Sequence, residues 1–154
     1  MTVQEMRLDQ IKPYKNNPRK NDEAVTAVAA SIREFGFKQP IVVDADGVII
    51  VGHTRYKAAQ MLGLKTVPVL VADDLSEDKV KAYRLADNKT SELAGWDFTA
   101  LAKEMAEIDM DMSKFGFTEA FDDSVLDDLF TEAEPKKKEP QKIRCPHCGE
   151  GFEP

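Results

Sequence analysis

The chain has 154 residues, enough for one ordinary domain and an appendage, and its 42% hydrophobic content is adequate for a packed core. Its apolar runs, such as residues 48–51, are far too short to span a bilayer, and residues 1–8 lack the apolar stretch of a signal peptide, so we expect a cytoplasmic protein with no membrane partner. Two cysteines are too few for a secreted disulfide scaffold.

The net charge of −7 is unevenly distributed along the chain. Residues 1–100 hold 14 basic and 14 acidic side chains, residues 101–134 hold 2 and 11, and residues 135–154 hold 5 and 3. A negative protein is in general a poor match for nucleic acid. Because the acidity lies in one segment, the first hundred residues remain able to bind an anion.

The N-terminal third predicts a strand, a loop and a helix. Residues 3–11 alternate apolar and polar side chains, which indicates a half-buried strand, and residues 12–19 are rich in turn-forming proline and asparagine. Asn21 is placed to cap a helix that ends at Gly36. The apolar residues of that helix recur at helical spacing: Val25, Val28, Ala29, Ile32 and Phe35.

The middle of the chain continues with alternating strands and helices. Residues 40–43 and 48–51 are short β-branched runs, and Asp46 and Gly47 between them predict a hairpin turn. A helix, a strand and a helix capped by Ser76 follow, over residues 53–62, 67–71 and 77–87. The predicted order is β-α-β-β-α-β-α, a mixed α+β domain.

Three segments are expected: an α+β domain over residues 1–98, an acidic helical extension over 99–134, and a linker with a short tail over 135–154. The extension predicts two amphipathic helices. The apolar residues of the first are Leu101, Met105 and Ile108, and those of the second are Phe121, Val125, Leu126, Leu129 and Phe130. With its acidic polar face, the extension is either a protein-docking region or a pair of solvated helices. Trp96, just before it, is expected to pack in the core, and the alternative is a platform on which a base stacks.

A candidate phosphate site lies where the strand over residues 48–51 passes through Gly52 into a helix. The first turn of a helix has unpaired N–H groups and partial positive charge, and a glycine before it allows an anion to approach closely. His53, Thr54 and Arg55 add an imidazole, a hydroxyl and a guanidinium. The alternative is that this pattern arises by chance and that His53 merely caps the helix.

Four blocks of the sequence together resemble the ParB/sulfiredoxin superfamily in their order and spacing. They cover residues 17–19, 31–43, 52–63 and 67–69. Residues 82–97 are further similar to ParB-like nuclease-type domains of phages and mobile elements, which often accompany DNA methyltransferases. The resemblance spans residues 3–98 and implies a ParB/sulfiredoxin-like fold in a prokaryotic or phage-infected host cell.

The resemblance also implies a ligand. In chromosome-partitioning ParB proteins the box that matches Gly52 to Arg55 helps to bind CTP with magnesium. Here Gly52 and Arg55 match, whereas His53 replaces a glutamate and Thr54 an arginine. Losing that carboxylate removes an oxygen ligand that magnesium prefers, which counts against CTP hydrolysis. Sulfiredoxins carry a cysteine at the position of His53, and no cysteine precedes Cys145 here, which counts against sulfiredoxin chemistry.

Four further residues match the family's boxes or lie near them, and the resemblance implies that they line the same pocket. They are Arg19, Gln39, Asn88 and Lys89. The alternative for each is an ordinary surface side chain. ParB proteins also place a basic DNA-binding region after this domain, whereas residues 97–134 here are acidic, the wrong sign for contact with a DNA backbone.

Catalysis is an open alternative to simple binding. A helix N-terminus tends to keep an imidazole neutral, so His53 beside Arg55 is a candidate general base or ligand of Mg²⁺ or Mn²⁺ for phosphodiester cleavage. Asp44, Asp46 and Asp87 are candidate partners of such a metal ion, although the sequence does not bring them together.

The tail contains Cys145 and Cys148 in a Cys-x-x-Cys pair, which resembles one zinc knuckle. Two thiolates are half of a tetrahedral Zn²⁺ site, so a complete site requires a second chain or another domain. The alternative is a disordered tail that binds no metal.

The leading hypothesis is a ParB-like, DNA-associated protein that binds nucleotide or DNA phosphate through Gly52, His53, Thr54 and Arg55, with metal-dependent nuclease activity as an option. A nucleotide-dependent enzyme, such as a small-molecule kinase or NTPase, is the first alternative. The second is a non-catalytic adaptor for a DNA methyltransferase that docks through residues 101–134. A homodimer is left open.

Overall fold

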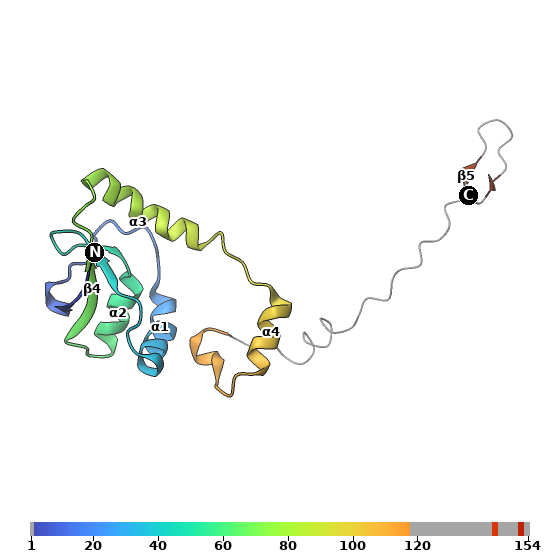
Figure 1. Ribbon diagram of the computed structural model, residues 1–154, viewed down its shortest axis with the longest axis horizontal. Coiled ribbons are helices and arrows are strands. Elements are labelled where there is room, and N and C mark those ends of the chain that lie inside the picture. Colours follow the sequence, from blue (N-terminus) through green and yellow to red (C-terminus); the bar gives the residue numbers. More distant parts are fainter. Residues whose placement is uncertain (1, 118–142, 145–150, 153–154) are drawn as a thin grey trace. The chain divides into compact units, whose positions relative to one another are not determined.

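The computed structural model describes residues 2–117, 143–144 and 151–152 (Figure 1). The chain divides into two compact units, Met1–Phe121 and Asp122–Pro154. Among the described residues, no helix is both long enough and apolar enough to cross a membrane.

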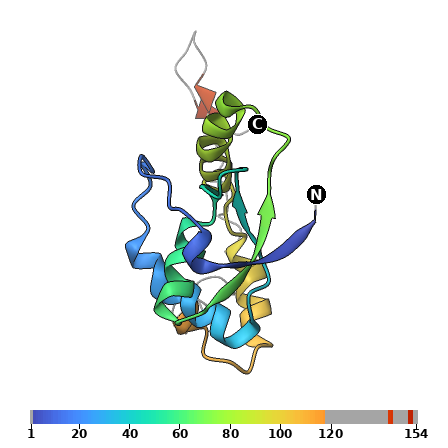
Figure 2. The same cartoon turned by 90° about the vertical axis from the view of Figure 1, so that its left-hand side faces the viewer.

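The first unit is built on a four-stranded sheet with the order β1-β4-β2-β3 (Figure 2). The strands are β1 (Val3–Arg7), β2 (Ile41–Val43), β3 (Ile49–Val51) and β4 (Thr66–Val71). β2 runs parallel to β4, whereas β1 pairs with β4 and β3 pairs with β2 in antiparallel fashion. The predicted hairpin is therefore confirmed as β2 and β3, at one edge of the sheet.

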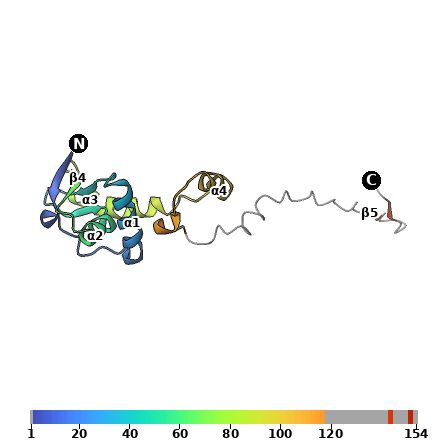
Figure 3. The same ribbon diagram turned by 90° about the horizontal axis from the view of Figure 1, so that it is seen from below.

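Two helices, α1 (Asp22–Phe35) and α2 (His53–Met61), lie side by side in Figures 1 and 3. Because side chains alternate along a strand, one face of the sheet carries a row of fully buried residues. These residues pack with Tyr56 and Ala59 of α2, and they are Ile41, Val43, Ile49, Val67 and Val69. Val25 and Ala29 of α1 pack in turn against Ala58. The core therefore fixes where α2 begins.

A third helix, α3 (Glu77–Ser91), packs against β3 through other side chains of the sheet. Val80 forms a small buried cluster with Ile50 and Ala72. Ile50 points away from its neighbour Ile49, so the two faces of β3 contribute to two separate clusters. The end of β3 is thus held between α2 and α3.

The predicted order of elements through residue 91 is confirmed, and only two elements differ in length by more than one residue. β1 ends at Arg7, not at residue 11, because the chain turns into a 3-10 helix, η1 (Leu8–Gln10). The Leu8 N–H donates to the Lys65 carbonyl at 2.9 Å, and Ile11 is then buried in the core. α3 extends to Ser91, one turn beyond the prediction.

The first helix of the acidic extension is present as α4 (Phe98–Ala106), followed by η2 (Met112–Phe115). The expectation that Trp96 packs in the core is wrong, because Trp96 is 64% exposed; its ring lies edge-on to that of Phe117, with 5.9 Å between centroids. The second predicted helix lies outside the described residues. In the second unit, β5 (Ile143–Arg144) pairs with β6 (Gly151–Phe152) in antiparallel fashion.

Candidate functional site

The start of α2 has an unusual local geometry that only glycine accommodates. Gly52 has φ 105° and ψ 25°, in the left-handed region. A Cβ atom there would lie 3.2 Å from Nε and Nη2 of Arg55 and 3.5 Å from the Ile41 Cα. The space that we expected to admit an anion is thus occupied by the Arg55 guanidinium. No side chain caps α2, so the N–H groups of its first turn have no partner within the helix.

A cavity of about 310 Å³, the α2-start cavity, opens at this point. Its walls are the loop before α1, the junction of β3 with α2, and one face of α3. Arg19, Lys20 and Arg55 are its cationic residues, and Asp87 is its single carboxylate. The other lining residues are Asn17, Asn21, Ala24, Ile50, Val51, Gly52, His53, Thr54, Asn88 and Ser91. A surplus of positive charge beside a helix N-terminus favours an anionic ligand.

Arg55 is the cation nearest the helix start. Its Nη1 donates to the Gln39 Oε1, and its Nε is buried with no hydrogen-bond partner among the described residues. Burial lowers the pKa of Arg55, while the nearby Asp87 carboxylate raises it. The guanidinium stays charged and keeps donor capacity for a ligand. Gln39, predicted as a ligand contact, therefore orients Arg55 in this structure.

A second cavity, the Phe37 cavity, of about 510 Å³, shares Gly52, Thr54 and Arg55 with the first. Its remaining lining is largely apolar, with Phe35 and Phe37 among the residues present. Arg55 therefore lies where a charged cavity meets an apolar one. A ligand with an anionic part and a flat apolar part matches this pairing.

His53 lies in the wall of the α2-start cavity, and its Nε2 accepts a hydrogen bond from the Tyr14 backbone N–H at 3.2 Å. Burial lowers the pKa of His53, and the charges of Arg84 and Lys57 lower it further. The ring is thus neutral near pH 7, and its proton is assigned to Nδ1 because Nε2 is an acceptor. The role of general base through Nε2 would require this hydrogen bond to break.

Thr54 is tied to the start of α1 through Asn21. The Asn21 Nδ2 donates to the Thr54 Oγ1 at 2.9 Å, and Lys57 Nζ donates to the Asn21 Oδ1 at 3.0 Å and the Asp22 Oδ1 at 2.6 Å. Asn21 occupies the predicted capping position of α1, but its side chain bridges the two helices and makes no capping hydrogen bond. The Thr54 hydroxyl keeps its own proton for a ligand.

Arg19 and Asn88, predicted from separate boxes, are brought together. Arg19 Nη1 donates to the Asn88 Oδ1 at 2.8 Å, and the Asn88 Nδ2 donates to the Arg84 carbonyl at 2.7 Å. The prediction that Lys89 lines the same pocket is not met, because Lys89 lines neither cavity. Its side chain is 73% exposed, and its Nζ pairs with Glu92 at 2.9 Å. Because each helical residue advances by about 100°, Lys89 lies roughly 160° around α3 from Asp87, away from the wall that Asp87 and Asn88 form.

Lys20 and Ser91 also line the α2-start cavity and were not predicted from the sequence, and Asp87 was predicted only as a candidate partner of a metal ion. Lys20 follows Arg19 in the same loop. Asp87, Asn88 and Ser91 share one helix face by their spacing of three and four residues, and that periodicity was the available signal.

Within residues 2–117, 143–144 and 151–152, no three His, Cys, Asp or Glu side chains gather in a way that would hold a metal ion. Asp44, a predicted partner of such an ion, pairs instead with Arg84 at 3.1 Å. Cys145 and Cys148, the predicted zinc ligands, lie outside the described residues.

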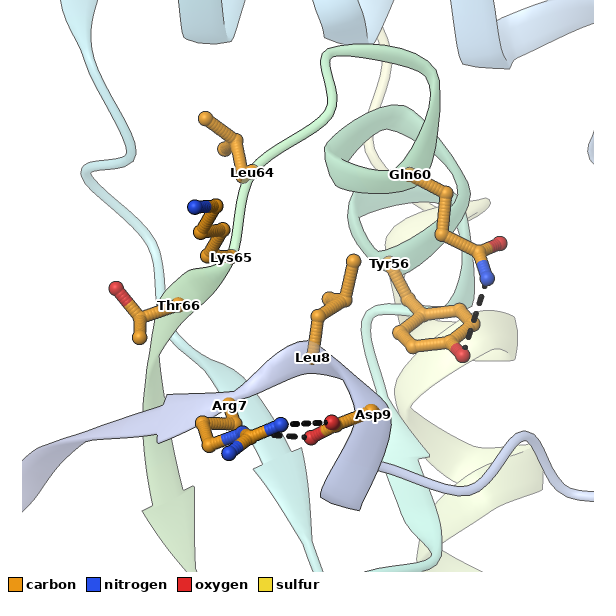
Figure 4. Close-up of a pocket in the computed structure, with 8 residues that line it drawn as sticks. All are labelled: Arg7, Leu8, Asp9, Tyr56, Gln60, Leu64, Lys65 and Thr66. Carbon is orange, nitrogen blue, oxygen red and sulfur yellow. Dashed lines mark hydrogen bonds and ion pairs between the residues drawn. The ribbon is translucent and has the colours of Figure 1, made fainter.

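A wider cavity of about 750 Å³, the Arg7 cavity, lies near the other end of α2 (Figure 4). Arg7 forms a two-pronged ion pair with Asp9, and Gln60 Nε2 donates to the Tyr56 hydroxyl at 3.2 Å. Asp9 thus neutralises Arg7, which leaves Lys65 as the one further cation among the described residues of this lining, and no α-helix begins there. Despite its greater volume, this cavity has no match to an anionic ligand comparable to that of the α2-start cavity.

Residues 1–89 match the family model of the ParB N-terminal domain. The ParB-like nuclease domain-containing protein YnaK of Escherichia coli (strain K12) is 38% identical over 73 residues, 47% of this chain and 84% of that protein. Stage 0 sporulation protein J of Bacillus subtilis (strain 168) is 35% identical over 92 residues, 56% of this chain and 32% of that protein. The chain thus spans about a third of the sporulation protein's length.

A solved structure is similar in both fold and sequence. It is the C-terminally truncated chromosome-partitioning protein ParB from Caulobacter crescentus, complexed with CTP-gamma-S. The TM-score is 0.60 and the sequence identity 28%, over 75% of this chain and 66% of that one.

Proposed function

Because the chain belongs to the ParB N-terminal domain family, we propose that it binds a nucleoside triphosphate at the start of α2, with CTP as the first candidate. The observation that carries this proposal is the α2-start cavity, in which Arg19, Lys20 and Arg55 outnumber the single carboxylate of Asp87. The similar ParB of Caulobacter crescentus is complexed with CTP-gamma-S, which supports a nucleotide as the ligand.

The phosphate chain would meet three kinds of donor in this cavity. The unpaired N–H groups of the first turn of α2 offer backbone donors, and the Thr54 hydroxyl offers a neutral one. Arg55 contributes its unpartnered Nε, and Arg19 exchanges its bond to Asn88 for a phosphate oxygen. Charge-assisted bonds of this kind are about twice as strong as neutral ones.

The base and sugar would extend into the Phe37 cavity. The two cavities share Gly52, Thr54 and Arg55, so a ligand that fills both must pass over the helix start. Volumes of about 310 and 510 Å³ lie within the range of small-molecule sites. Phe35 and Phe37 supply apolar surface for a flat ring.

A divalent cation, Mg²⁺ or Mn²⁺, fits the oxygen donors of the α2-start cavity. Asp87 is the one lining carboxylate, and Asn88 beside it and Asn17 in the loop before α1 are lining residues with amide oxygens. Magnesium bound with a nucleotide needs only one or two protein carboxylates, because phosphates and water complete its shell. These residues would hold the cation, which neutralises charge on the phosphates.

DNA is the second candidate partner, through the same cations acting on backbone phosphate. Membership of the ParB N-terminal domain family supports DNA as a partner. The equal numbers of basic and acidic residues in 1–100 count against it, because binding to a DNA backbone favours an excess of basic residues. A nuclease is supported by the name of the Escherichia coli relative, and the Tyr14 hydrogen bond to His53 opposes its simplest mechanism. The kinase and the methyltransferase adaptor stay predictions.

The test is calorimetric titration of the full chain with CTP, ATP and ADP, each with Mg²⁺. We expect binding by the wild type and loss of at least tenfold in affinity in Arg55→Ala, about the effect of one charge-assisted hydrogen bond. Lys103→Ala, which removes an exposed cation from α4, is the matched control and should bind as the wild type. No binding of any nucleotide by the wild type would refute the proposal and favour DNA phosphate.

A further inference from the structure

Arg84, in the middle of α3, is the only buried charged residue in the part of the chain that the structure describes, at 9% exposure. It lines neither the α2-start cavity nor the Phe37 cavity. A buried guanidinium is unfavourable unless its donors are paired, so its partners indicate what it holds in place.

The Arg84 guanidinium contacts two separate segments. Its Nε donates to the Ile49 carbonyl at 3.1 Å and its Nη2 to the Asp44 Oδ2 at 3.1 Å, which fastens α3 to the β2–β3 hairpin. Its Cζ lies 4.0 Å from the centroid of the Tyr14 ring, a cation–π contact. Tyr14 is also the residue whose backbone N–H donates to the His53 Nε2.

Arg84 also sets one wall of the α2-start cavity through its own helix. Asp87, Asn88 and Ser91 follow it by three, four and seven residues, so they share its helix face, and all three line the cavity. The Asn88 side chain donates to the Arg84 carbonyl and accepts from Arg19. The α3 wall and Arg19 in the loop wall are therefore both connected to Arg84, which itself lies outside the cavity.

We propose that Arg84 is a positioning residue for the α2-start cavity. It docks the α3 wall on the β2–β3 hairpin, and through the Tyr14 ring it holds the loop residue whose backbone N–H fixes the His53 ring. Its effect on nucleotide binding rests on the proposed function. Its effect on His53 is independent of any ligand and is measurable in the free protein.

The test uses Arg84→Met, which keeps a long side chain but removes the charge and all donors. NMR of the His53 ring in the free protein gives the first readout. We expect the pKa of His53 to rise, because the Arg84 charge lowers it, and the Nε2 resonance to move as the Tyr14 hydrogen bond is lost. Titration with CTP and Mg²⁺ gives the second, with affinity weaker by roughly tenfold or more.

Two further variants distinguish a positioning role of Arg84 from an effect of losing a positive charge on α3 or of losing the fold. Lys81→Met removes an exposed cation from the same helix and should leave the His53 resonances and the affinity unchanged. Arg84→Lys keeps the charge but loses the planar fork, so the pKa of His53 should stay near that of the wild type while the Nε2 resonance moves and affinity falls.

A folded Arg84→Met protein with unchanged His53 resonances would overturn the inference. If Arg84→Met does not fold, Arg84→Lys is the deciding variant. His53 resonances and a CTP affinity equal to those of the wild type in Arg84→Lys would refute the positioning role. If the wild type binds no nucleotide, the proposed function fails, whereas the His53 resonances still decide whether Arg84 positions the ring.

Discussion

Replacing Gly52 tests how the start of α2 is built. A left-handed backbone costs an L-residue about 1–2 kcal/mol, and the φ of 105° at Gly52 lies well beyond the centre of that region. The added Cβ would also press on the Arg55 guanidinium at 3.2 Å, so that side chain must move by a few tenths of an ångström. We expect Gly52→Ala to lower the free energy of unfolding by roughly 1–3 kcal/mol and to weaken nucleotide binding.

Gly63→Ala is the matched control for the backbone cost. Gly63 has φ 67°, and nothing lies within 4 Å of its added Cβ, so only the left-handed conformation contributes to its loss of stability. Urea unfolding followed by circular dichroism gives both free energies. In the double variant Gly52→Ala with Arg55→Ala, the stability lost through the contact of the added Cβ with the guanidinium should be recovered. The stability lost through the left-handed backbone should not be recovered. If Gly52→Ala loses no more stability than Gly63→Ala and keeps its affinity, the guanidinium is not seated on Gly52.

Three other predictions concern separate parts of the chain. Arg19→Ala should weaken CTP binding roughly tenfold, whereas Lys89→Ala should not; equal effects would contradict the orientation of α3. Burial holds the pKa of His53 below its unfolded value of 6.5, so its contribution to stability is complete above pH 6.5 and falls as the pH drops toward the folded pKa. The free energy of unfolding should be measured for the wild type and for His53→Asn between pH 5 and 7.5. The difference between the two should shrink as the pH falls, and a difference that does not change with pH would refute the prediction. Metal analysis should find about one Zn²⁺ per two chains, abolished by a serine at Cys145 or Cys148; zinc retained by these variants would exclude the pair as ligands.

Local sequence patterns predicted most of the fold because each element carries its own signal. The helix that ends at Gly36 and the hairpin around Gly47 depend on spacing and turn residues within a few positions, and both are confirmed. β1 was predicted too long because apolar side chains continue to recur, at Leu8 and Ile11, while the chain turns. That turn depends on the Lys65 carbonyl, distant in sequence, which no local pattern contains.

The site was predictable in position but not in its internal bonds. Glycine followed by His53, Thr54 and Arg55 located the helix start, and family resemblance added Arg19 and Asn88, which the structure brings to the same cavity. The prediction that glycine leaves room for an anion was incomplete, because the Arg55 side chain folds back over it. Whether a side chain or a ligand fills such a space depends on partners such as Gln39, which is 16 residues from Arg55 in the sequence.

Arg84 was invisible to sequence reasoning for a related reason. On a helix surface an arginine is usually solvated, and nothing adjacent to it in the sequence marks it as buried. Its burial is favourable only because Asp44, Ile49 and Tyr14 converge on it from segments 35 to 70 residues away. Because the Arg84 guanidinium contacts all three residues at once, its loss removes a contact from each of them. The walls of the α2-start cavity are therefore expected to shift together when Arg84 is replaced, and not one at a time.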